Sequence, residues 1–332
     1  MGIQRRCHFS PAMLGVAIGI ASSGVLFGQE SQPSPLPRTV NLSLIVVDRS
    51  NHSIDDVQKD EIRLLENNMP QTISSFSKAD KAVDYGIAID NSGSVRPIFP
   101  LLLAAVRVFL ENHKTDDECF IERFISSDKI ERIQEFTSDR AALLKPLSSL
   151  YVEGGQSAVI DATYLAVQHI AQHPSGPQRR RALIIFTDGE DRASYYTKDQ
   201  LLQLLRATDV QVFAIGLVGQ LDNSSGLIQP APQQKARDFL KLIARESGGR
   251  VFFPNKKKEL SEALAEVFHD IHTQYEIGYQ SNDISKDNFH SVQIEVIGSS
   301  SREDRTAIIR PGYYLNPPEA DSKDKKKKPK KP

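Results

Sequence analysis

The sequence predicts an α/β fold with a doubly wound, mostly parallel sheet, and three observations lead to that class. From residue 81 onward, short apolar runs that suit buried strands alternate with longer segments that have the period of helices. This alternation is typical of parallel strands covered by helices. Both flanks instead alternate apolar and polar residues, as half-buried strands do. The composition, 39% hydrophobic and 25% charged, excludes a wholly disordered chain.

Residues 1–28 have the three zones of a secretory signal peptide. A pair of arginines precedes an apolar run over residues 12–27, and the small residue Gly28 follows it. We expect cleavage near Gly28, which makes the mature protein secreted or periplasmic. An uncleaved anchor is the alternative, although the run is shorter than the roughly 20 residues that span a membrane. The Pro- and Ser-rich residues 29–37 then form a linker.

Residues 38–80 are predicted to form an N-terminal β segment. Residues 40–47 alternate apolar and polar side chains, and two shorter strands are expected at 62–66 and 71–76. Between these two lies the pair Asn67-Asn68, and asparagine tolerates the positive backbone angles of a tight hairpin. We therefore expect a small β unit before the α/β region.

Residues 81–273 carry the α/β alternation. Strands are expected at 85–90, 118–125, 134–136, 181–187, 210–218 and 251–253. Helices are expected between them and after the last strand, at 97–113, 157–173, 198–206, 235–247 and 259–272. Gly248-Gly249 is a helix stop after the helix at 235–247. The last helix has its apolar residues on one face, which indicates a helix packed on the sheet.

Residues 274–316 return to a strand pattern, with strands expected at 275–279, 290–297 and 307–314. We infer that these strands pair with those of the N-terminal β segment, so that the α/β domain is inserted into a β unit built from both flanks. Two separate β appendages are the alternative.

Residues 317–332 form a Lys-rich tail that is predicted to be disordered, because it has too little apolar surface to bury. The tail is rich in lysine, so the total charge of −1 means that the rest of the mature chain is acidic. An acidic body is a poor nucleic-acid binder, so no nucleic-acid partner is expected. A weak contact of the tail with an anionic surface is the alternative to a merely solvated segment.

Oxygen-bearing side chains follow three of the predicted strands or precede their helices. Asp90, Ser92 and Ser94 occupy alternate positions after one strand, Ser157 precedes a helix, and Asp188 follows another strand. Ligands bind at the carboxyl edge of such sheets, and oxygen ligands suit Mg²⁺, with Mn²⁺ or Ca²⁺ as alternatives. The sequence thus predicts one metal site made of these five residues. Helix capping by the serines and an ordinary turn at Asp188 are the competing interpretations.

The three motifs Asp90-x-Ser92-x-Ser94, Gly155-Gln156-Ser157 and Thr187-Asp188-Gly189 resemble the metal-ion-dependent adhesion site of von Willebrand factor type A (VWA) domains. The resemblance implies a Rossmann-like VWA fold and a metal ion held by hydroxyls directly and by aspartates directly or through water. It also implies that a carboxylate of the binding partner completes the coordination. Ser157 stands where the family usually has threonine, which keeps the hydroxyl and loses a methyl group.

Residues 38–315 further resemble a group of secreted bacterial VWA-related proteins. The resemblance lies in Pro70-Gln71, Gly248-Gly249-Arg250, Gln274-Tyr275 and Arg310-Pro311-Gly312-Tyr313-Tyr314. It implies an architecture rather than a ligand.

The expected function is that of an exported binding protein whose metal ion captures an acidic group of a protein partner. Only Asp90 and Asp188 offset the double charge of the ion, because the other three side chains are neutral hydroxyls. Such an ion favours an anionic further ligand. The alternative is a structural protein of the cell envelope in which the metal only stabilises the loops.

An enzyme is not expected, and a metal-assisted hydrolase is the third and weakest hypothesis. A phosphoryl-accepting aspartate of the haloacid-dehalogenase type has a second acid two residues on, where this chain has Ser92. The pairs His169/His173 and His269/His272 have helical spacing but no third ligand in view, so these histidines are expected to face solvent. After loss of Cys7 with the signal peptide, Cys119 is expected to be a core residue.

Overall fold

The computed structural model describes residues 38–176, 178–221, 231–281, 288–297 and 305–316, which all belong to one compact unit. The predicted signal peptide, linker and Lys-rich tail lie outside these residues. No helix among the described segments is long and apolar enough to cross a membrane.

A six-stranded sheet forms the centre of the α/β region, with the strand order β10-β9-β8-β5-β6-β7. The strands are β5 (Val83–Asp90), β6 (Glu118–Phe124), β7 (Ile130–Thr137), β8 (Arg180–Thr187), β9 (Gln211–Gly216) and β10 (Val251–Phe252). All neighbours pair in parallel except β7, which is antiparallel to β6. All eight residues of β5 are buried, as the continuous apolar runs of a parallel sheet require. The predicted fold class is confirmed.

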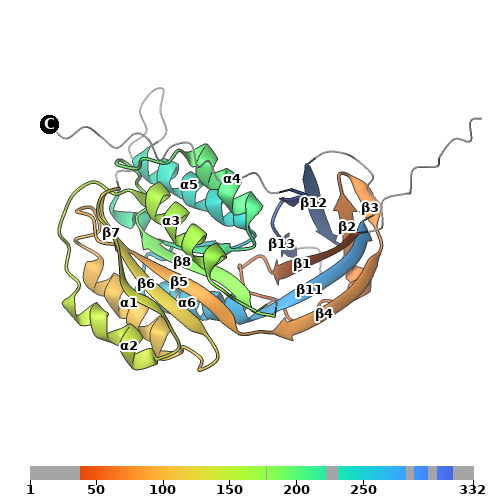
Figure 1. Cartoon of the computed structure of the whole chain (residues 1–332), viewed down its shortest axis with the longest axis horizontal. Coiled ribbons are helices and arrows are strands. Elements are labelled where there is room, and N and C mark those ends of the chain that lie inside the picture. Colours follow the sequence, from red (N-terminus) through yellow and green to blue (C-terminus); the bar gives the residue numbers. More distant parts are fainter. Residues whose placement is uncertain (1–37, 177, 222–230, 282–287, 298–304, 317–332) are drawn as a thin grey trace, which may run out of the picture. The chain divides into compact units, whose positions relative to one another are not determined.

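Helices cover both faces of this sheet (Figure 1). One face packs against α1 (Phe99–Glu111), α2 (Arg140–Leu144) and α6 (Lys257–His272), and the other against α3 (Val159–Gln172), α4 (Lys198–Ala207) and α5 (Pro232–Ser247). Short 3-10 helices are η1 (Lys59–Glu61), η2 (Lys145–Ser149) and η3 (Val218–Gln220). Gly248 ends α5 with a φ of 74°, the left-handed angle that a glycine cap supplies.

Strands from the two flanks of the α/β region pair with one another, as the sequence predicted, but they form two four-stranded sheets. One has the order β13-β1-β11-β4 and the other β14-β12-β2-β3. The strands are β1 (Arg38–Val47), β2 (Ile62–Glu66), β3 (Met69–Gln71), β4 (Ile73–Asp80), β11 (Thr273–Ser281), β12 (Phe289–Val296), β13 (Thr306–Ile308) and β14 (Gly312–Tyr314). The two sheets share one apolar core. The turn expected at Asn67 and Asn68 is present, with φ angles of 47° and 63°, and joins β2 to the short β3. Most of the strand expected at 71–76 belongs instead to β4, which pairs with β11 in the other sheet.

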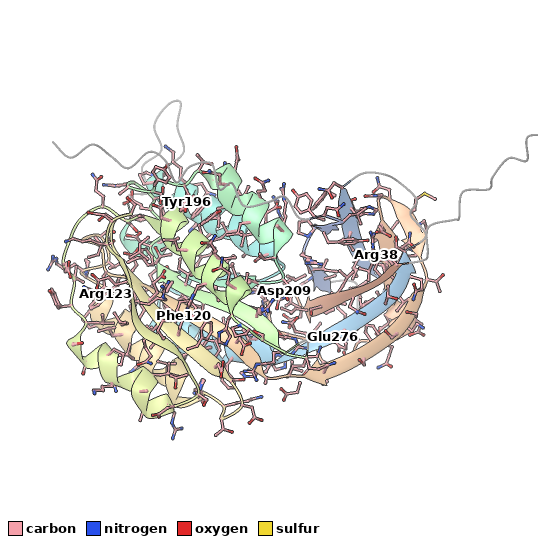
Figure 2. All side chains as sticks on the ribbon, in the orientation of Figure 1. Arg38, Phe120, Arg123, Tyr196, Asp209 and Glu276 are labelled. Carbon is pink, nitrogen blue, oxygen red and sulfur yellow. The ribbon has the colours of Figure 1, made fainter. Side chains whose placement is uncertain are left out.

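Buried arginines connect the α/β region to this β unit. Arg180 of β8 donates to the Glu276 carboxylate of β11 and to the Ala79 carbonyl oxygen of β4, both at 3.0 Å; Glu276 is labelled in Figure 2. Arg250 donates to the carboxylate of Asp270 in α6 and to the carbonyl oxygen of Asn51, in the segment after β1. These contacts join segments that are up to about 200 residues apart, so they form only when the fold is complete.

Candidate metal centre

The parallel strands β5 and β8 are neighbours, with Ile89 opposite Phe186. Their carboxyl ends therefore deliver Asp90 and Asp188 to the same edge of the sheet. The third contributor is the loop before α3, where the Ala158 backbone N–H donates to the Ile125 carbonyl at 2.7 Å and fixes the loop at the end of β6. This edge of an open α/β sheet is where ligands bind.

Asp90 lies at the centre of the cluster and accepts three hydrogen bonds. Its Oδ1 accepts from the Ser92 backbone N–H at 2.9 Å, and its Oδ2 accepts from the hydroxyls of Ser157 at 3.2 Å and Thr187 at 2.7 Å. The carboxylate is completely buried. Its position is thus set by donors from three separate loops.

Ser92 and Ser94 extend the cluster toward the second aspartate. Their hydroxyl oxygens lie 3.1 Å apart, and the Ser94 side chain lies near enough to the Asp188 carboxylate to lower its pKa against the effect of burial. The Asp188 Oδ1 accepts from the Glu190 backbone N–H at 3.0 Å. The structure therefore brings all five predicted residues together: Asp90, Ser92, Ser94 and Ser157 form one hydrogen-bonded group, and Asp188 lies beside it. Thr187, which hydrogen-bonds Asp90, was not in the predicted ligand set. The motif Thr187-Asp188-Gly189 was the signal that could have added it.

Two glycines shape the loop that carries Ser157. Gly154 and Gly155 have φ angles of 96° and 100°, which favour glycine. A Cβ on Gly155 would lie 2.8 Å from the Ile125 Cγ2 atom, and the Gly155 carbonyl oxygen accepts from the Gly93 N–H at 3.2 Å. The glycine-rich loop thus packs directly on the loop of Ser92.

The loop after β8 is held against the start of α3. The Ser157 carbonyl oxygen accepts from the backbone N–H groups of Arg192 and Ala193 at 2.8 and 3.1 Å. Asp161 accepts from two further backbone N–H groups of this loop, and the Asp191 carboxylate accepts from the Ile160 N–H at 3.1 Å. The Asp191 carboxylate therefore helps to hold the loop after β8 against the start of α3.

The two aspartates of the cluster have no cationic partner. Burial raises the pKa of Asp90 to about 6, with a further contribution from the negative charge of Asp188, and burial also raises the pKa of Asp188. In the described part of the chain, neither carboxylate has a Lys, Arg or His nitrogen within ion-pair distance, and the buried Asp188 Oδ2 has no hydrogen-bond donor. Two buried carboxylates and neutral hydroxyls around one point form a donor set that fits a hard divalent cation.

A further buried acid was missed by the sequence reasoning. Glu122 of β6 is 1% exposed, lies in register with Ala88 of β5, and has an Oε1 without a hydrogen-bond partner. Burial raises its pKa to about 8, against a weak opposing effect of Arg132. Nothing in the alternation of the strand distinguishes this carboxylate from a solvent-facing one.

The prediction that the four paired histidines face solvent was wrong for His272, and the other three are only half-buried. His272 is 2% exposed and its Nε2 lies 2.8 Å from the Asp117 carboxylate. The rings of His169 and His173 both pack on Phe136, the second stacked at a centroid distance of 3.8 Å. Helical spacing places two side chains on one face, but it does not say what covers that face.

Residues 84–266 match the family model of the von Willebrand factor type A domain. Because the match covers more than half of the 332 residues, the chain belongs to the von Willebrand factor type A family.

Solved structures with a similar fold share little sequence with this chain. BatB from Bacteroides thetaiotaomicron is 17% identical, covers 57% of this chain and 98% of its own, and has a TM-score of 0.45. An aerotolerance-related membrane protein from Bacteroides fragilis is 16% identical over 57% and 99% of the two chains, with a TM-score of 0.43. A von Willebrand factor type A protein from Catenulispora acidiphila is 11% identical over 84% and 73%, with a TM-score of 0.45. No curated protein matches this chain.

Proposed function

We propose that this chain is an exported binding protein whose VWA domain holds a divalent cation, Mg²⁺ in the first instance, and uses it to bind a carboxylate of a protein partner. The observation that carries the proposal is the pair of buried aspartates that have no Lys, Arg or His partner among the described residues, and Asp188 has an oxygen that accepts no hydrogen bond from them. The family membership supports it, because VWA domains often mediate protein binding. Export rests on the signal-peptide pattern of residues 1–28.

Asp90, Ser92, Ser94, Ser157 and Asp188 would hold the ion. A bound Mg²⁺ would supply a positive centre that attracts an anionic oxygen of the partner. The residues of this chain do the positioning: Ser157 and Thr187 orient the Asp90 carboxylate, and the Gly93 contact with Gly155 keeps the two hydroxyl-bearing loops together. The proposal assigns a binding rather than a catalytic role.

The first experiment is a thermal melt of the mature chain with EDTA or Mg²⁺, beside Asp90→Ala. A ligand that binds only the folded state raises its stability, so the wild type should melt higher in Mg²⁺ and the variant should not respond. An equal response of both proteins would contradict the proposed site.

The second experiment tests the carboxylate. Immobilised peptides that differ only in Asp against Asn, or Glu against Gln, are incubated with the protein in Mg²⁺ and in EDTA. Retention that requires both the carboxylate and Mg²⁺ supports the proposed function. A metal-dependent melt without any carboxylate preference would favour the alternative, in which the ion stabilises the loops of an envelope protein.

A further inference from the structure

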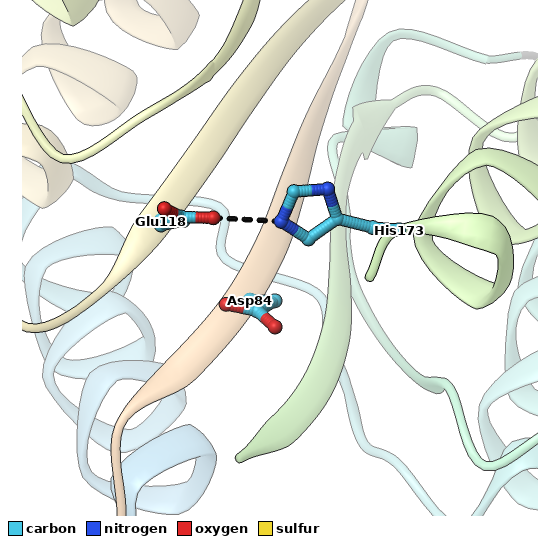
Figure 3. A group of neighbouring side chains, drawn as sticks. All are labelled: Asp84, Glu118 and His173. Atoms are coloured by element: carbon cyan, nitrogen blue, oxygen red, sulfur yellow. Dashed lines mark hydrogen bonds and ion pairs between the residues drawn. The ribbon is translucent and has the colours of Figure 1, made fainter. Parts of the chain in front are cut away.

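Three metal-ligand side chains meet at the opposite edge of the sheet from the candidate metal centre (Figure 3). Asp84 lies near the start of β5, Glu118 is the first residue of β6, and His173 directly follows α3. One ligand atom from each lies within 4.8 Å of the others. Two carboxylates and an imidazole form a donor set that occurs in zinc sites.

Asp84 supplies the observation that points to a ligand. Its side chain is only 1% exposed, and its Oδ1 accepts from the Arg179 Nε at 2.6 Å. Its buried Oδ2 has no hydrogen-bond partner. A buried polar atom without a partner costs free energy, and native structures rarely leave one. A bound cation in the cluster would satisfy this oxygen.

The other two side chains are held ready and can be reached from solvent. The His173 Nε2 lies 2.6 Å from the Glu118 carboxylate, the contact dashed in Figure 3. The imidazole ring stacks on Phe136 with an interplanar angle of 16°, which fixes its orientation. The side chains of His173 and Glu118 are 17% and 45% exposed, so an ion has an entry path and Glu118 is free to move.

We propose that Asp84, Glu118 and His173 bind Zn²⁺. Zinc ligands at about 2.0–2.1 Å from the ion lie about 3.4 Å from one another, so the Glu118–His173 contact of 2.6 Å must widen and the separations of up to 4.8 Å must shorten. Both changes need movements of the two partly exposed side chains, Glu118 and His173. On binding, the metal takes the place of the proton on the His173 Nε2, and that proton leaves to solvent. The three protein ligands leave one position for water.

The charges around the cluster favour a cation despite Arg179. Asp84 and Glu118 both act on the single Arg179 guanidinium, so the acids outnumber the base by one, while the nearby Asp117 is paired with His272. A ligating carboxylate that is itself hydrogen-bonded is the usual arrangement around a bound metal. Arg179 would therefore orient Asp84 while Zn²⁺ takes the free oxygen.

This site is separate from the candidate metal centre. Asp84 and Asp90 lie six residues apart on β5, which corresponds to about 20 Å at about 3.3 Å per residue. A substitution at one edge can thus be combined with a substitution at the other, and the two metal responses can be measured independently.

The test is a Zn²⁺ titration by calorimetry of the tag-free chain in an Asp90→Ala background, which removes the centre of the other cluster. We expect one Zn²⁺ per chain. Changing a residue that only supports a metal ligand weakens binding by up to roughly 100-fold. Because His173 is itself a ligand, His173→Ala should weaken Zn²⁺ binding by more than this, and Glu118→Gln should weaken it clearly as well. Co²⁺ in place of Zn²⁺ should give visible absorption bands that His173→Ala abolishes.

The matched control is His169→Ala. His169 lies one turn earlier on α3, packs on the same Phe136 and pairs with Glu135, outside the cluster. This variant should bind Zn²⁺ as the parent does. Equal affinity in the His173→Ala variant, or no saturable Zn²⁺ binding by the parent, would overturn the proposal. If His173→Ala fails to fold by circular dichroism, Glu118→Gln decides the question.

Discussion

At the amino end of β5 the buried carboxylates lie beside cations or histidines, whereas at its carboxyl end two buried carboxylates have only neutral donors. Asp84 pairs with Arg179 and Asp117 contacts His272. Asp90 instead accepts hydrogen bonds from hydroxyls and a backbone N–H, and Asp188 accepts one from a backbone N–H. One strand thus connects an edge where most buried charges are matched to an edge where, among the described residues, two buried carboxylates have no cationic partner.

The matched charges hold the parts of the fold together. Asp270 is buried beside Arg250, and Ser53 donates to Asp270 at 2.6 Å. In the β unit, the buried Glu66 contacts His290 at 3.0 Å and accepts from Ser281 and Tyr313. At these positions buried charge is matched within the chain, whereas Asp90, Asp188 and Glu122 have no cation within ion-pair distance among the described residues.

The largest expected effect comes from breaking a matched cluster. Arg250→Ala should lower the free energy of unfolding by about 3–5 kcal/mol, because it removes the guanidinium from the buried Asp270 carboxylate, which then keeps the Ser53 hydroxyl and the His269 ring as neighbours. Urea denaturation measures this loss. The control is Arg245→Ala, whose side chain is 69% exposed and whose effect should stay within about 0.5 kcal/mol. Similar losses of stability in both variants would contradict the claim that the buried contact of Arg250 with Asp270 stabilises the fold more than an exposed arginine does.

The next effect concerns the unmatched Glu122. Its pKa of about 8 in the folded protein lies above the ordinary value of 4.5, so the native state holds the proton that the unfolded chain releases. Stability should therefore fall as the pH rises from 4.5 to 8. Glu122→Gln should be more stable than the wild type at pH 8 by about 2 kcal/mol. The gain is smaller than the whole stability cost of the shifted pKa, because the amide that replaces the carboxyl group is a buried polar group too.

Unfolding titrations of both proteins at several pH values measure this difference. It should shrink as the pH falls toward 4.5. A constant difference across the pH range would mean that the ionisation of Glu122 is not its cause.

The third prediction sharpens the contrast at the candidate metal centre itself. At ten times its Kd, Mg²⁺ should stabilise the wild type by about 1.4 kcal/mol. Asp188→Asn should lose this gain while its metal-free form is at least as stable as the wild type, because one of two buried like charges is removed. Melts with and without EDTA measure both. Asp191→Asn, next along the loop but bonded to Ile160, should keep the response.

The smallest effect is expected from Ser157→Thr. This change keeps the hydroxyl that donates to Asp90, so the Mg²⁺ affinity should stay within about threefold, less than the loss of one such hydrogen bond would cost. Ser157→Ala, which removes the donor, should weaken binding by about tenfold or more. Calorimetric Mg²⁺ titrations of the two variants measure the difference. Equal affinities would show that the Ser157 hydroxyl takes no part in the site.

Much of the fold could be predicted because the hydrophobic pattern is local. The buried run of β5 and the amphipathic α6 both follow from the identity of neighbouring residues. The division of the β unit into two sheets could not be predicted in this way. Whether β11 pairs with β1 or with β12 depends on competition among distant strands, and the structure places it between β1 and β4.

The candidate site divides in the same manner. The strand-end positions of Asp90 and Asp188 could be predicted because parallel strands bring their carboxyl ends together. The contact of Thr187 with Asp90, 97 positions apart, and the burial of Glu122 depend on register and on the packing of the covering helices.

By itself, the sequence determined most of the strands and helices and the order of the oxygen-bearing motifs, because these depend on periodicity and local backbone preference. The strand expected at 307–314 was wrong, because the chain there forms β13 and β14 in two different sheets. Only the tertiary structure decided which charges are matched. The partners of Arg180 and Arg250 include segments far along the chain, whereas one oxygen each of Asp84, Glu122 and Asp188 finds no donor among the described residues. The physical reason is that a charge is satisfied by its neighbours in space, and folding selects those neighbours among residues that sequence spacing does not relate.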